Sequence, residues 1–460
     1  MNSKISSPQL SRRSFLQAGA IAGAAAFTAG GLFKPKEAKA KTFDSYYDAY
    51  NVDMNKFERF EENRTAFNMS FRYCTADQVP IYFTGASFPV EAAHVGLIGP
   101  MEGDSPRMKE IFAEGKIEKA YEMGDPGFTP VDHAYFFGAM ESYNNLAYLK
   151  SDYTPTAEEK FEFESPEAAS SAIKKVAKKF GADLVGICAY DPNFSYKTEV
   201  YYGDMDMETH TTIPGTPNFN KPFELDFEAK STIVVATEMD YESVKAAGSW
   251  IMEGSVWVGY SACQEICVKL AAFLRLLGYR TRYSESYMGP MVQDAVAAGL
   301  GEPGRNSILI TEEFGPRVRL AKIYTDLENV QYDKVKKFGV TEFCEVCQVC
   351  SDTCPTAAIT KLSLNDPENA PANLCSQKGV QKYYCDAQKC HEHWQVLDNG
   401  CGICMFVCPY NKPSTWNHEL VKLVTHIPGL NSMARYFDHF FGFGQLATDQ
   451  ELIDFWHKTI

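Results

Sequence analysis

The chain has 460 residues, of which 45% are hydrophobic, and a formal net charge of −15. A chain of this length and composition can bury a large core, and two or three domains are expected. The acidic balance and the lack of a basic block in the sequence argue against nucleic acid as a partner.

The first forty residues have the pattern of a twin-arginine export signal. Ser11-Arg12-Arg13-Ser14 precedes a weakly apolar stretch, 18–33, and Ala38-Lys39-Ala40 offers a small-x-small cleavage site. A membrane anchor is the alternative, but the stretch is shorter than the roughly 20 apolar residues that a spanning helix needs. We therefore expect residues 1–40 to be removed from an exported protein.

Residues 41–165 are expected to form an N-terminal wrapping segment of helices and loops. The segment is rich in aromatic residues, and Pro and Gly interrupt its later part, as between Gly124 and Pro130. One interpretation is that it helps to close over a large apolar ligand, and the other is that its aromatic residues are ordinary core. The early aromatic residues are Tyr46, Tyr47, Tyr50, Phe57, Phe60, Phe67, Phe71 and Tyr73.

A regular alternation of helices and apolar strands defines the next predicted domain, 166–330. Ser165 is a good N-cap and Pro166 suits the first helical position, so a helix is expected to run to Phe180 and to end at Gly181. Such an alternation indicates an α/β or α+β sandwich. A long helix is expected at 256–277, and strands are expected at 183–190, 231–237, 281–284, 307–311 and 318–324.

Ten of the fourteen cysteines lie between residues 344 and 409. The run that begins at Cys344 has the spacing C-x2-C-x2-C-x3-C-P of bacterial ferredoxins, which bind [4Fe–4S] clusters. The run that begins at Cys401 is C-x2-C-x3-C-P, with Asp398 where a further cysteine belongs. We therefore predict a ferredoxin-like domain with two [4Fe–4S] clusters at 331–415.

The last cysteine of such a run ligates the other cluster in two-cluster ferredoxins, which assigns seven ligands. The eighth is Cys375, Cys385 or Cys390, of which Cys390 is nearest to the second run. A pair of zinc knuckles or a disulfide scaffold is the alternative, but zinc sites rarely use four cysteines at this spacing followed by proline. The assigned ligands are Cys344, Cys347, Cys350 and Cys408 for cluster one, and Cys354, Cys401 and Cys404 for cluster two.

The rest of the sequence carries no signature of another redox cofactor. It has no G-x-G-x-x-G after a predicted strand and no C-x-x-C-H, so neither a dinucleotide nor an attached haem is expected. A Phe-rich tail, 416–460, is expected to pack back on the body. Clusters are assembled in a reducing cytoplasm and the twin-arginine route carries folded cargo, so the cysteines are not a secreted disulfide framework.

The order of these features resembles that of respiratory reductive dehalogenases over essentially the whole chain. Between the two cysteine runs, Lys389-Cys390 followed by Trp394 is similar to an element of that family, as is the continuation of the second run to Lys412. The resemblance favours Cys390 as the eighth ligand. It implies a nitroreductase-like domain that holds a corrinoid base-off, in keeping with the lack of a D-x-H-x-x-G sequence.

The resemblance also implies a catalytic pair. Thr237-Glu-Met-Asp-Tyr241 resembles a strand-end Thr-x3-Tyr, whose tyrosine is taken as the proton donor to the carbon that loses halide. Gly301-Glu-Pro-Gly-Arg305 resembles the motif whose cation lies beside that tyrosine. A guanidinium there would stabilise phenolate and ease proton release from a group with pKa about 10. The alternatives are a buried strand-end tyrosine and a salt-bridged loop arginine.

Four further residues are assigned through the resemblance. Arg317 and Arg319 are expected at the polar periphery of the corrinoid, unless they merely cap the strand. Thr237 and Trp394 are expected in the substrate pocket, although a packing role suits Trp394 equally well beside a cluster ligand.

These features predict an exported enzyme that removes halide from an organohalide as the terminal step of anaerobic respiration. Electrons would pass through the clusters to cob(I)alamin-type chemistry, with Tyr241 as the proton donor. The implied partners are a small integral-membrane anchor subunit, which holds the enzyme at the outer face of the cytoplasmic membrane, and a quinol-linked electron donor. The moderate length resembles members that act on small chloroalkanes and chlorophenols, and we favour a small chlorinated alkane.

Two other functions remain open at this stage. Epoxyqueuosine reductases have the same clusters and corrinoid, but they act on tRNA in the cytoplasm, which fits neither the export signal nor the acidic charge. A plain electron-transfer subunit would leave the long segment before the clusters without a role.

Overall fold

A computed structural model describes residues 40–66, 104–107, 110–111, 118–147, 152–153, 155, 157–201, 205–206, 211–212, 218–284, 288–371, 373–411 and 444–457. The chain divides into two units, Met1–Ala40 and Lys41–Ile460, and every helix and strand below belongs to the second. The predicted export signal before Ala40 lies outside the described residues, as do Phe67, Phe71 and Tyr73. The domain boundaries given above stay predictions.

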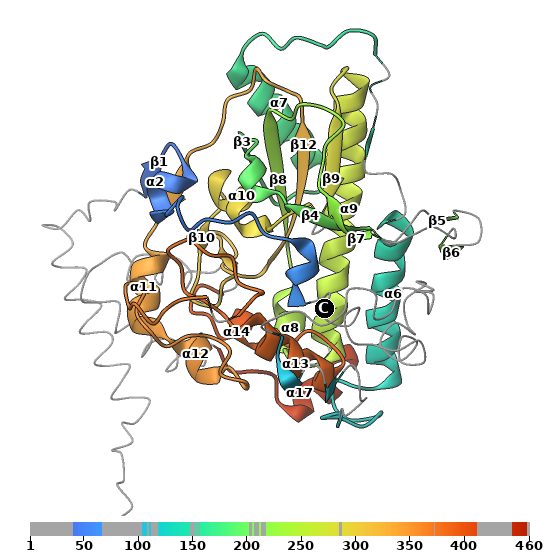
Figure 1. Ribbon diagram of the computed structural model, residues 1–460. Helices are drawn as coiled ribbons and strands as arrows, with labels where there is room; N and C mark the ends of the chain where they lie inside the picture. The colour runs from blue at the N-terminus through green and yellow to red at the C-terminus, as the bar shows by residue number, and fades with distance from the viewer. Residues whose placement is uncertain are drawn as a thin grey trace, which may run out of the picture. The chain divides into compact units, whose positions relative to one another are not determined.

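Helices and strands are labelled as in Figure 1. The helices are α2 (Tyr46–Tyr50), α6 (Pro130–Ala147), α7 (Pro166–Lys179), α8 (Tyr241–Lys245), α9 (Trp250–Leu276), α10 (Met291–Ala297), α11 (Val340–Cys347), α12 (Val349–Thr353), α13 (Ala387–Leu397), α14 (Ile403–Phe406) and α17 (Asp449–Ile453), with short 3-10 helices at Glu62–Arg64, Pro192–Phe194 and Phe455–His457. The strands are β1 (Lys41–Phe43), β2 (Asp152–Tyr153), β3 (Leu184–Ala189), β4 (Thr198–Tyr201), β5 (Met205–Asp206), β6 (Thr211–Thr212), β7 (Asn218–Pro222), β8 (Ser231–Glu238), β9 (Thr281–Ser284), β10 (Glu302–Pro303), β11 (Leu309–Ile310), β12 (Val318–Thr325) and β13 (Val335–Lys337).

Five strands form one sheet in the order β2-β9-β12-β8-β3, and each strand is antiparallel to its neighbours. The central strands β8 and β12 pair over their full length, from Glu238 opposite Val318 to Ser231 opposite Thr325. Antiparallel pairing throughout makes the body α+β rather than α/β. The other strands form two-stranded sheets, β1 with β13, β4 with β7, β5 with β6 and β10 with β11.

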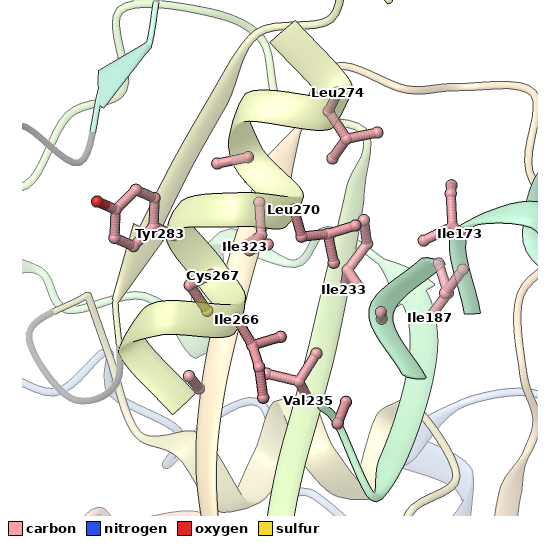
Figure 2. Close-up of a cluster of buried hydrophobic side chains, with 14 of the residues drawn as sticks. Ile173, Ile187, Ile233, Val235, Ile266, Cys267, Leu270, Leu274, Tyr283 and Ile323 are labelled. Carbon is pink, nitrogen blue, oxygen red and sulfur yellow. The ribbon is translucent and has the colours of Figure 1, made fainter. Parts of the chain in front are cut away.

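One face of the sheet packs against α7 and α9, as Figure 2 shows. Ile233 and Val235 of β8 and Ile323 of β12 meet Ile173 of α7 and Leu270 of α9, and all five side chains are fully buried. Burying one such side chain contributes about 1.5–3 kcal/mol, so this layer supplies much of the stability of the body.

The opposite face of the sheet packs against α10 and α2. Because successive side chains of a strand point to opposite faces, Val234 and Ala236 of β8 lie here, with Val296 of α10. Tyr46 and Tyr50 of α2 belong to the same buried cluster. These tyrosines are core residues, as the second interpretation of the aromatic segment has it.

A fully buried ion pair joins the sheet to α10 on this face. Lys322 Nζ of β12 donates to Asp294 Oδ2 at 2.6 Å, and both side chains are inaccessible to solvent. Burial raises the pKa of Asp294 and lowers that of Lys322, while the attraction between the two charges opposes both shifts. Removing one partner alone leaves a buried charge without compensation.

The predicted elements of the body are confirmed with two differences. α7 begins at Pro166, the Ser165 side chain accepts from the Ala168 N–H, and the chain turns away through Gly181 at φ 112°. α9 begins at Trp250, six residues before the expected start at 256, because its first turns pack on the cysteine-rich segment and not on the sheet. The strand expected at 307–311 is reduced to β11.

The shortening of that strand has a local cause. Ser307 adopts a left-handed conformation with φ 61°, and the Thr311 hydroxyl donates to the carbonyl of Gly315, four residues on. Both ends of the apolar run are therefore committed to turns.

The described end of the tail, 444–457, contacts the body. Lys245 Nζ of α8 and Glu451 Oε1 lie 2.5 Å apart, and Trp456 Nε1 donates to Asp132 Oδ1 of α6 at 2.7 Å. Among the described residues, no helix combines the length and the apolarity that crossing a membrane requires.

We expect Lys322→Met to lower the free energy of unfolding by about 3–5 kcal/mol, because Asp294 is then a buried charge without a partner. The double variant Lys322→Met/Asp294→Leu should recover most of this loss, since both charges are gone. Chemical denaturation of the single and double variants measures both values. A single variant as stable as the parent would contradict this account.

Candidate active site and cluster-binding segment

The thiols of the first cysteine run lie on two short helices. α11 carries Cys344 and Cys347 and α12 carries Cys350, and between the helices Gln348 has a left-handed conformation with φ 53°. Burial, followed by the nearby thiols of Cys347, Cys408 and Cys350, raises the pKa of Cys344 well above its usual value. The four ligands assigned to cluster one therefore lie together.

The thiols assigned to cluster two form a second group. Burial, followed by the thiols of Cys401 and Cys354, raises the pKa of Cys390 to about 12. The pKa of Cys404 is raised by burial and next by Cys390. Cys385 lies beside the same group, since burial and then Cys390 and Cys354 raise its pKa. Cys390 and Cys385 are thus both placed to be the eighth ligand.

The two groups of buried thiols favour metal binding over the other roles that cysteine has in proteins. No disulfide bond joins the described cysteines. Within the described residues, no three His, Cys, Asp or Glu side chains converge closely enough to hold a single metal ion. Thiols with raised pKa values are neutral until a metal's positive charge stabilises the thiolate, which is the ligand form.

A cavity of about 250 Å³ adjoins the second group of thiols. It is lined in part by Cys385, Cys390, His391 and Trp394. The Trp394 side chain also hydrogen-bonds to the Cys390 thiol, which lowers the pKa of that thiol against the effect of burial. Trp394 thus lines a cavity and contacts a predicted ligand at the same time.

The structure places Arg305 against the first cluster segment, and its expected position beside Tyr241 stays a prediction. Its Nε donates to the carbonyl of Cys344 at 3.0 Å, and its Nη1 donates to the carbonyls of Thr360 at 3.0 Å and Leu362 at 2.7 Å. Its side chain is 1% exposed and stacks on the ring of Tyr383. These bonds commit the guanidinium to the cysteine-rich segment.

Arg317 is the cation that the structure places against Tyr241. Its guanidinium carbon lies 5.5 Å from the centre of the tyrosine ring. Its Nη1 pairs with Glu238 at 2.5 Å and donates to the carbonyl of Met239, and its Nε donates to Asn411 Oδ1 at 3.0 Å. This side chain holds strand ends and the second cysteine run together, and its expected place at the corrinoid periphery stays a prediction.

Tyr241 lies between the sheet and the second cysteine run. It is the first residue of α8, directly after the end of β8, and its ring centre is 5.5 Å from that of Phe406. Phe406 stands between the ligands Cys404 and Cys408, and it packs with Met252 in a buried apolar cluster that Tyr241 joins. A phenol beside a guanidinium, shielded by apolar side chains and close to cluster ligands, can deliver a proton in a largely dry environment.

Thr237 and Arg319 face α9. The Thr237 hydroxyl donates to the carbonyl of Gly259 at 3.3 Å, a bond that fixes the helix to the strand. Arg319 stacks on Tyr260, with 5.0 Å between its guanidinium carbon and the ring centre. Thr237 therefore has a structural contact where a pocket position was expected.

One buried donor on this side has no protein partner. Arg319 Nε is buried and makes no hydrogen bond. Such a donor fits a ligand that presents amide carbonyl oxygens, as the side chains of a corrinoid do, and burying it unpaired is costly. The role of Arg319 at the corrinoid stays a prediction, with which this buried donor is compatible.

The sequence interpretation missed three polar residues that hold the cysteine-rich segment. Glu302 Oε1 accepts from the N–H groups of Phe338 and Val340 at the start of α11. Glu253 Oε2 accepts from the N–H of Gly400 at 2.8 Å, next to Cys401. Asn411 is the third, through Arg317. A carboxylate in the apolar run of α9 was the signal for Glu253.

Comparison with known families supports the cluster assignment. A family model described as a 4Fe-4S double cluster binding domain matches residues 343–411. The match includes both cysteine runs and α13. The prediction of two [4Fe–4S] clusters in this segment is therefore supported by an independent pattern.

Curated relatives resemble the chain over more than half of its length. A tetrachloroethene reductive dehalogenase of Desulfitobacterium hafniense is 39% identical over 319 residues, 64% of this chain and 57% of that protein. One of Sulfurospirillum multivorans is 32% identical over 303 residues, 63% of this chain and 60% of that protein. The chain thus spans about three fifths of the length of these relatives. An epoxyqueuosine reductase of Lactococcus garvieae is 32% identical over 126 residues, 27% of this chain and 33% of that protein.

A solved structure has the same fold. The catabolic reductive dehalogenase NpRdhA superimposes with a TM-score of 0.62 at 20% identity, over 88% of this chain and 49% of that chain. At this identity the likeness shows the fold alone. The predicted fold class, an α+β body with a C-terminal two-cluster segment, is confirmed, and so is the resemblance to reductive dehalogenases.

We expect Cys390→Ser to damage cluster two and to spare cluster one, because Cys390 lies among the other three thiols of that group. Cys385→Ser is the matched control, since it removes a neighbouring thiol at a similar depth and should leave both clusters intact. Iron content and the electron paramagnetic resonance of each reduced variant measure this. The reverse result would make Cys385 the eighth ligand.

Proposed function

We propose that this chain is a corrinoid- and iron–sulfur-dependent reductive dehalogenase. The observation that carries the proposal is the 39% identity to a tetrachloroethene reductive dehalogenase over 319 residues, 64% of this chain. The two groups of thiols and the Tyr241–Arg317 contact supply the electron carriers and the proton donor that such a reaction needs.

The reaction consumes two electrons and one proton for each halide released. The carbon–halogen bond breaks, the halide leaves as an anion, and a carbon–hydrogen bond forms. A bound corrinoid would supply the strongly reducing cobalt centre at which the organohalide accepts electrons. Arg319, with its buried unpaired Nε, is the described residue best suited to hold the polar edge of that cofactor.

Tyr241 holds the proton at its phenol oxygen. As the proton leaves, negative charge develops on the ring, and the Arg317 guanidinium stabilises it. Glu238 and Asn411 keep the guanidinium in place. Met252 and Phe406 pack in the same apolar cluster and exclude water from this side of the phenol.

The organohalide itself is proposed at the level of a class. The length of the chain favours small chlorinated alkanes, while the relatives above are named for tetrachloroethene. Both belong in the first assays, together with a chlorophenol.

The setting of the reaction belongs to the same proposal. The twin-arginine pattern at 11–17 supports export, and an exported terminal reductase needs electrons from the membrane. We propose a quinol-linked donor and a small integral-membrane anchor subunit, with the enzyme peripheral on the outer face of the cytoplasmic membrane.

We expect Tyr241→Phe to reduce dehalogenation at least about a hundredfold, since general acids contribute that much or more, while cobalt and iron contents stay unchanged. Tyr332→Phe is the control, because it removes a hydroxyl from a partly exposed surface tyrosine that donates to the carbonyl of Lys230. Near-normal turnover by Tyr241→Phe would exclude it as the proton donor.

Metal content distinguishes the proposal from a plain electron carrier. Anaerobically purified protein supplied with corrinoid should contain about one cobalt and eight irons per chain. Elemental analysis measures both. Eight irons without cobalt would leave an electron carrier, and cobalt with activity on an epoxyqueuosine-containing tRNA but on no organohalide would favour the other corrinoid enzyme.

A further inference from the structure

The predicted clusters have buried charges of opposite sign beside them. At cluster one the charge is the guanidinium of Arg305, which is 1% exposed. The Arg305 side chain makes three hydrogen bonds to carbonyls. In addition, the backbone N–H of Arg305 donates to the Cys344 Sγ at 3.4 Å. The guanidinium also acts on the Cys350 thiol, whose pKa it lowers against the effect of burial. Cluster one thus has a cation and a donor to one sulfur.

At cluster two the buried charge is the carboxylate of Glu253. Its side chain comes from α9 and is buried against the segment that holds Cys401. Its Oε2 accepts from the Gly400 N–H at 2.8 Å, and its Oε1 accepts from Trp257 Nε1 at 2.9 Å. Burial raises the pKa of Glu253, and the two N–H groups from which its oxygens accept oppose that shift by stabilising the ionised carboxylate.

Charged neighbours do not cancel the buried cation beside cluster one or the buried carboxylate beside cluster two. Glu345 approaches Arg305 only to 4.0 Å, and its side chain is 31% exposed, so solvent screens it. Arg319 acts on Glu253, but no hydrogen bond joins the two side chains among the bonds described.

At the second group of thiols, Asp386 acts on Cys390 and Cys385 with the same sign of charge as Glu253, and the buried Lys382 acts on Cys385 with the opposite sign. Because Cys385 lies outside the predicted ligand set, the cation dominates at cluster one and the negative charges dominate at cluster two.

We infer that Arg305 and Glu253 hold the two clusters at different reduction potentials, with cluster one the higher and cluster two the lower. Reduction adds one electron to a cluster and makes it more negative. A buried cation and a hydrogen bond to sulfur stabilise the reduced form, and a buried carboxylate destabilises it. The protein thereby sets the potentials of two chemically identical cubes apart.

The order of potentials fits the position of each cluster. The segment of cluster two packs on α8 and α9, where Met405 and Phe406 meet the apolar cluster around Tyr241. In the proposed function, on which this use of the inference rests, the electron leaves from that side toward a strongly reducing centre. A low potential at cluster two makes that last transfer favourable.

The test is a potentiometric titration of the reconstituted protein, followed by electron paramagnetic resonance of the two reduced clusters. Arg305→Met should lower the potential of cluster one and leave cluster two unchanged. Glu253→Gln should raise the potential of cluster two and leave cluster one unchanged. Each shift should reach about tenfold in the one-electron equilibrium constant, which is about 59 mV.

Lys361→Met is the matched control for loss of a positive charge. Lys361 lies in the same segment as cluster one, but its side chain is 61% exposed and pairs with Asp352 on α12. Solvent screens this charge, so neither potential should move appreciably. A shift equal to that of Arg305→Met would overturn the role given to buried charge.

Other outcomes also decide the inference. If cluster one has the lower potential in the parent protein, or if both variants leave the potentials unchanged, it is wrong. Should Arg305→Met fail to keep its clusters, Glu253→Gln decides alone, with Arg305→Lys expected to keep cluster one near its parent potential. The potentials are measured without substrate. If the variants show the expected shifts but the protein dehalogenates no organohalide, this inference holds and the proposed function is wrong.

Discussion

The structure depends on a buried guanidinium that ties a segment with little regular structure to a sheet. The cysteine-rich segment has helices of only four to eleven residues, and such short helices are not stable alone. Arg305 offers donors to three of its carbonyls from a position with almost no exposure. Burying a charge of this kind is costly unless it is hydrogen-bonded, and these three bonds offset part of that cost. The positions of the cysteines that are predicted to bind the clusters therefore depend on contacts with the body.

Much of the fold could be predicted because its signals are local. A capping serine followed by proline identified the start of α7, and an apolar run identified the central strand β8, which is buried on both faces. Cysteine spacing predicted the two-cluster segment that the family model matches, because the geometry of a cube places several of its ligands only a few positions apart. Each of these signals lies within a dozen residues of the structure that it predicts.

The partner of a charged side chain is not a local property. Arg305 and Arg317 lie in the same stretch between α10 and α11, and nothing in their neighbours indicates which guanidinium reaches Tyr241 and which reaches Cys344. The choice is made by the register of β12 against β8, which brings Arg317 to the end of the strand that precedes Tyr241. Long-range register of this kind becomes visible only once the sheet is formed.

One helix serves two structural purposes. α9 has 27 residues, so it is about 40 Å long. Leu270, near one end, lies in the core of the sheet, while Met252 and Glu253 contact Gly402 and Gly400 beside Cys401 near the other. A Cβ on either glycine would meet the Glu253 or Met252 side chain, so the ligand loop lies close against α9. Substitutions around Leu270 that raise thermal stability would therefore also shift the far end of α9. Such a shift would displace the loop that holds the predicted cluster ligand Cys401. Selection for a stable fold and selection for electron transfer through the clusters therefore act on the same helix.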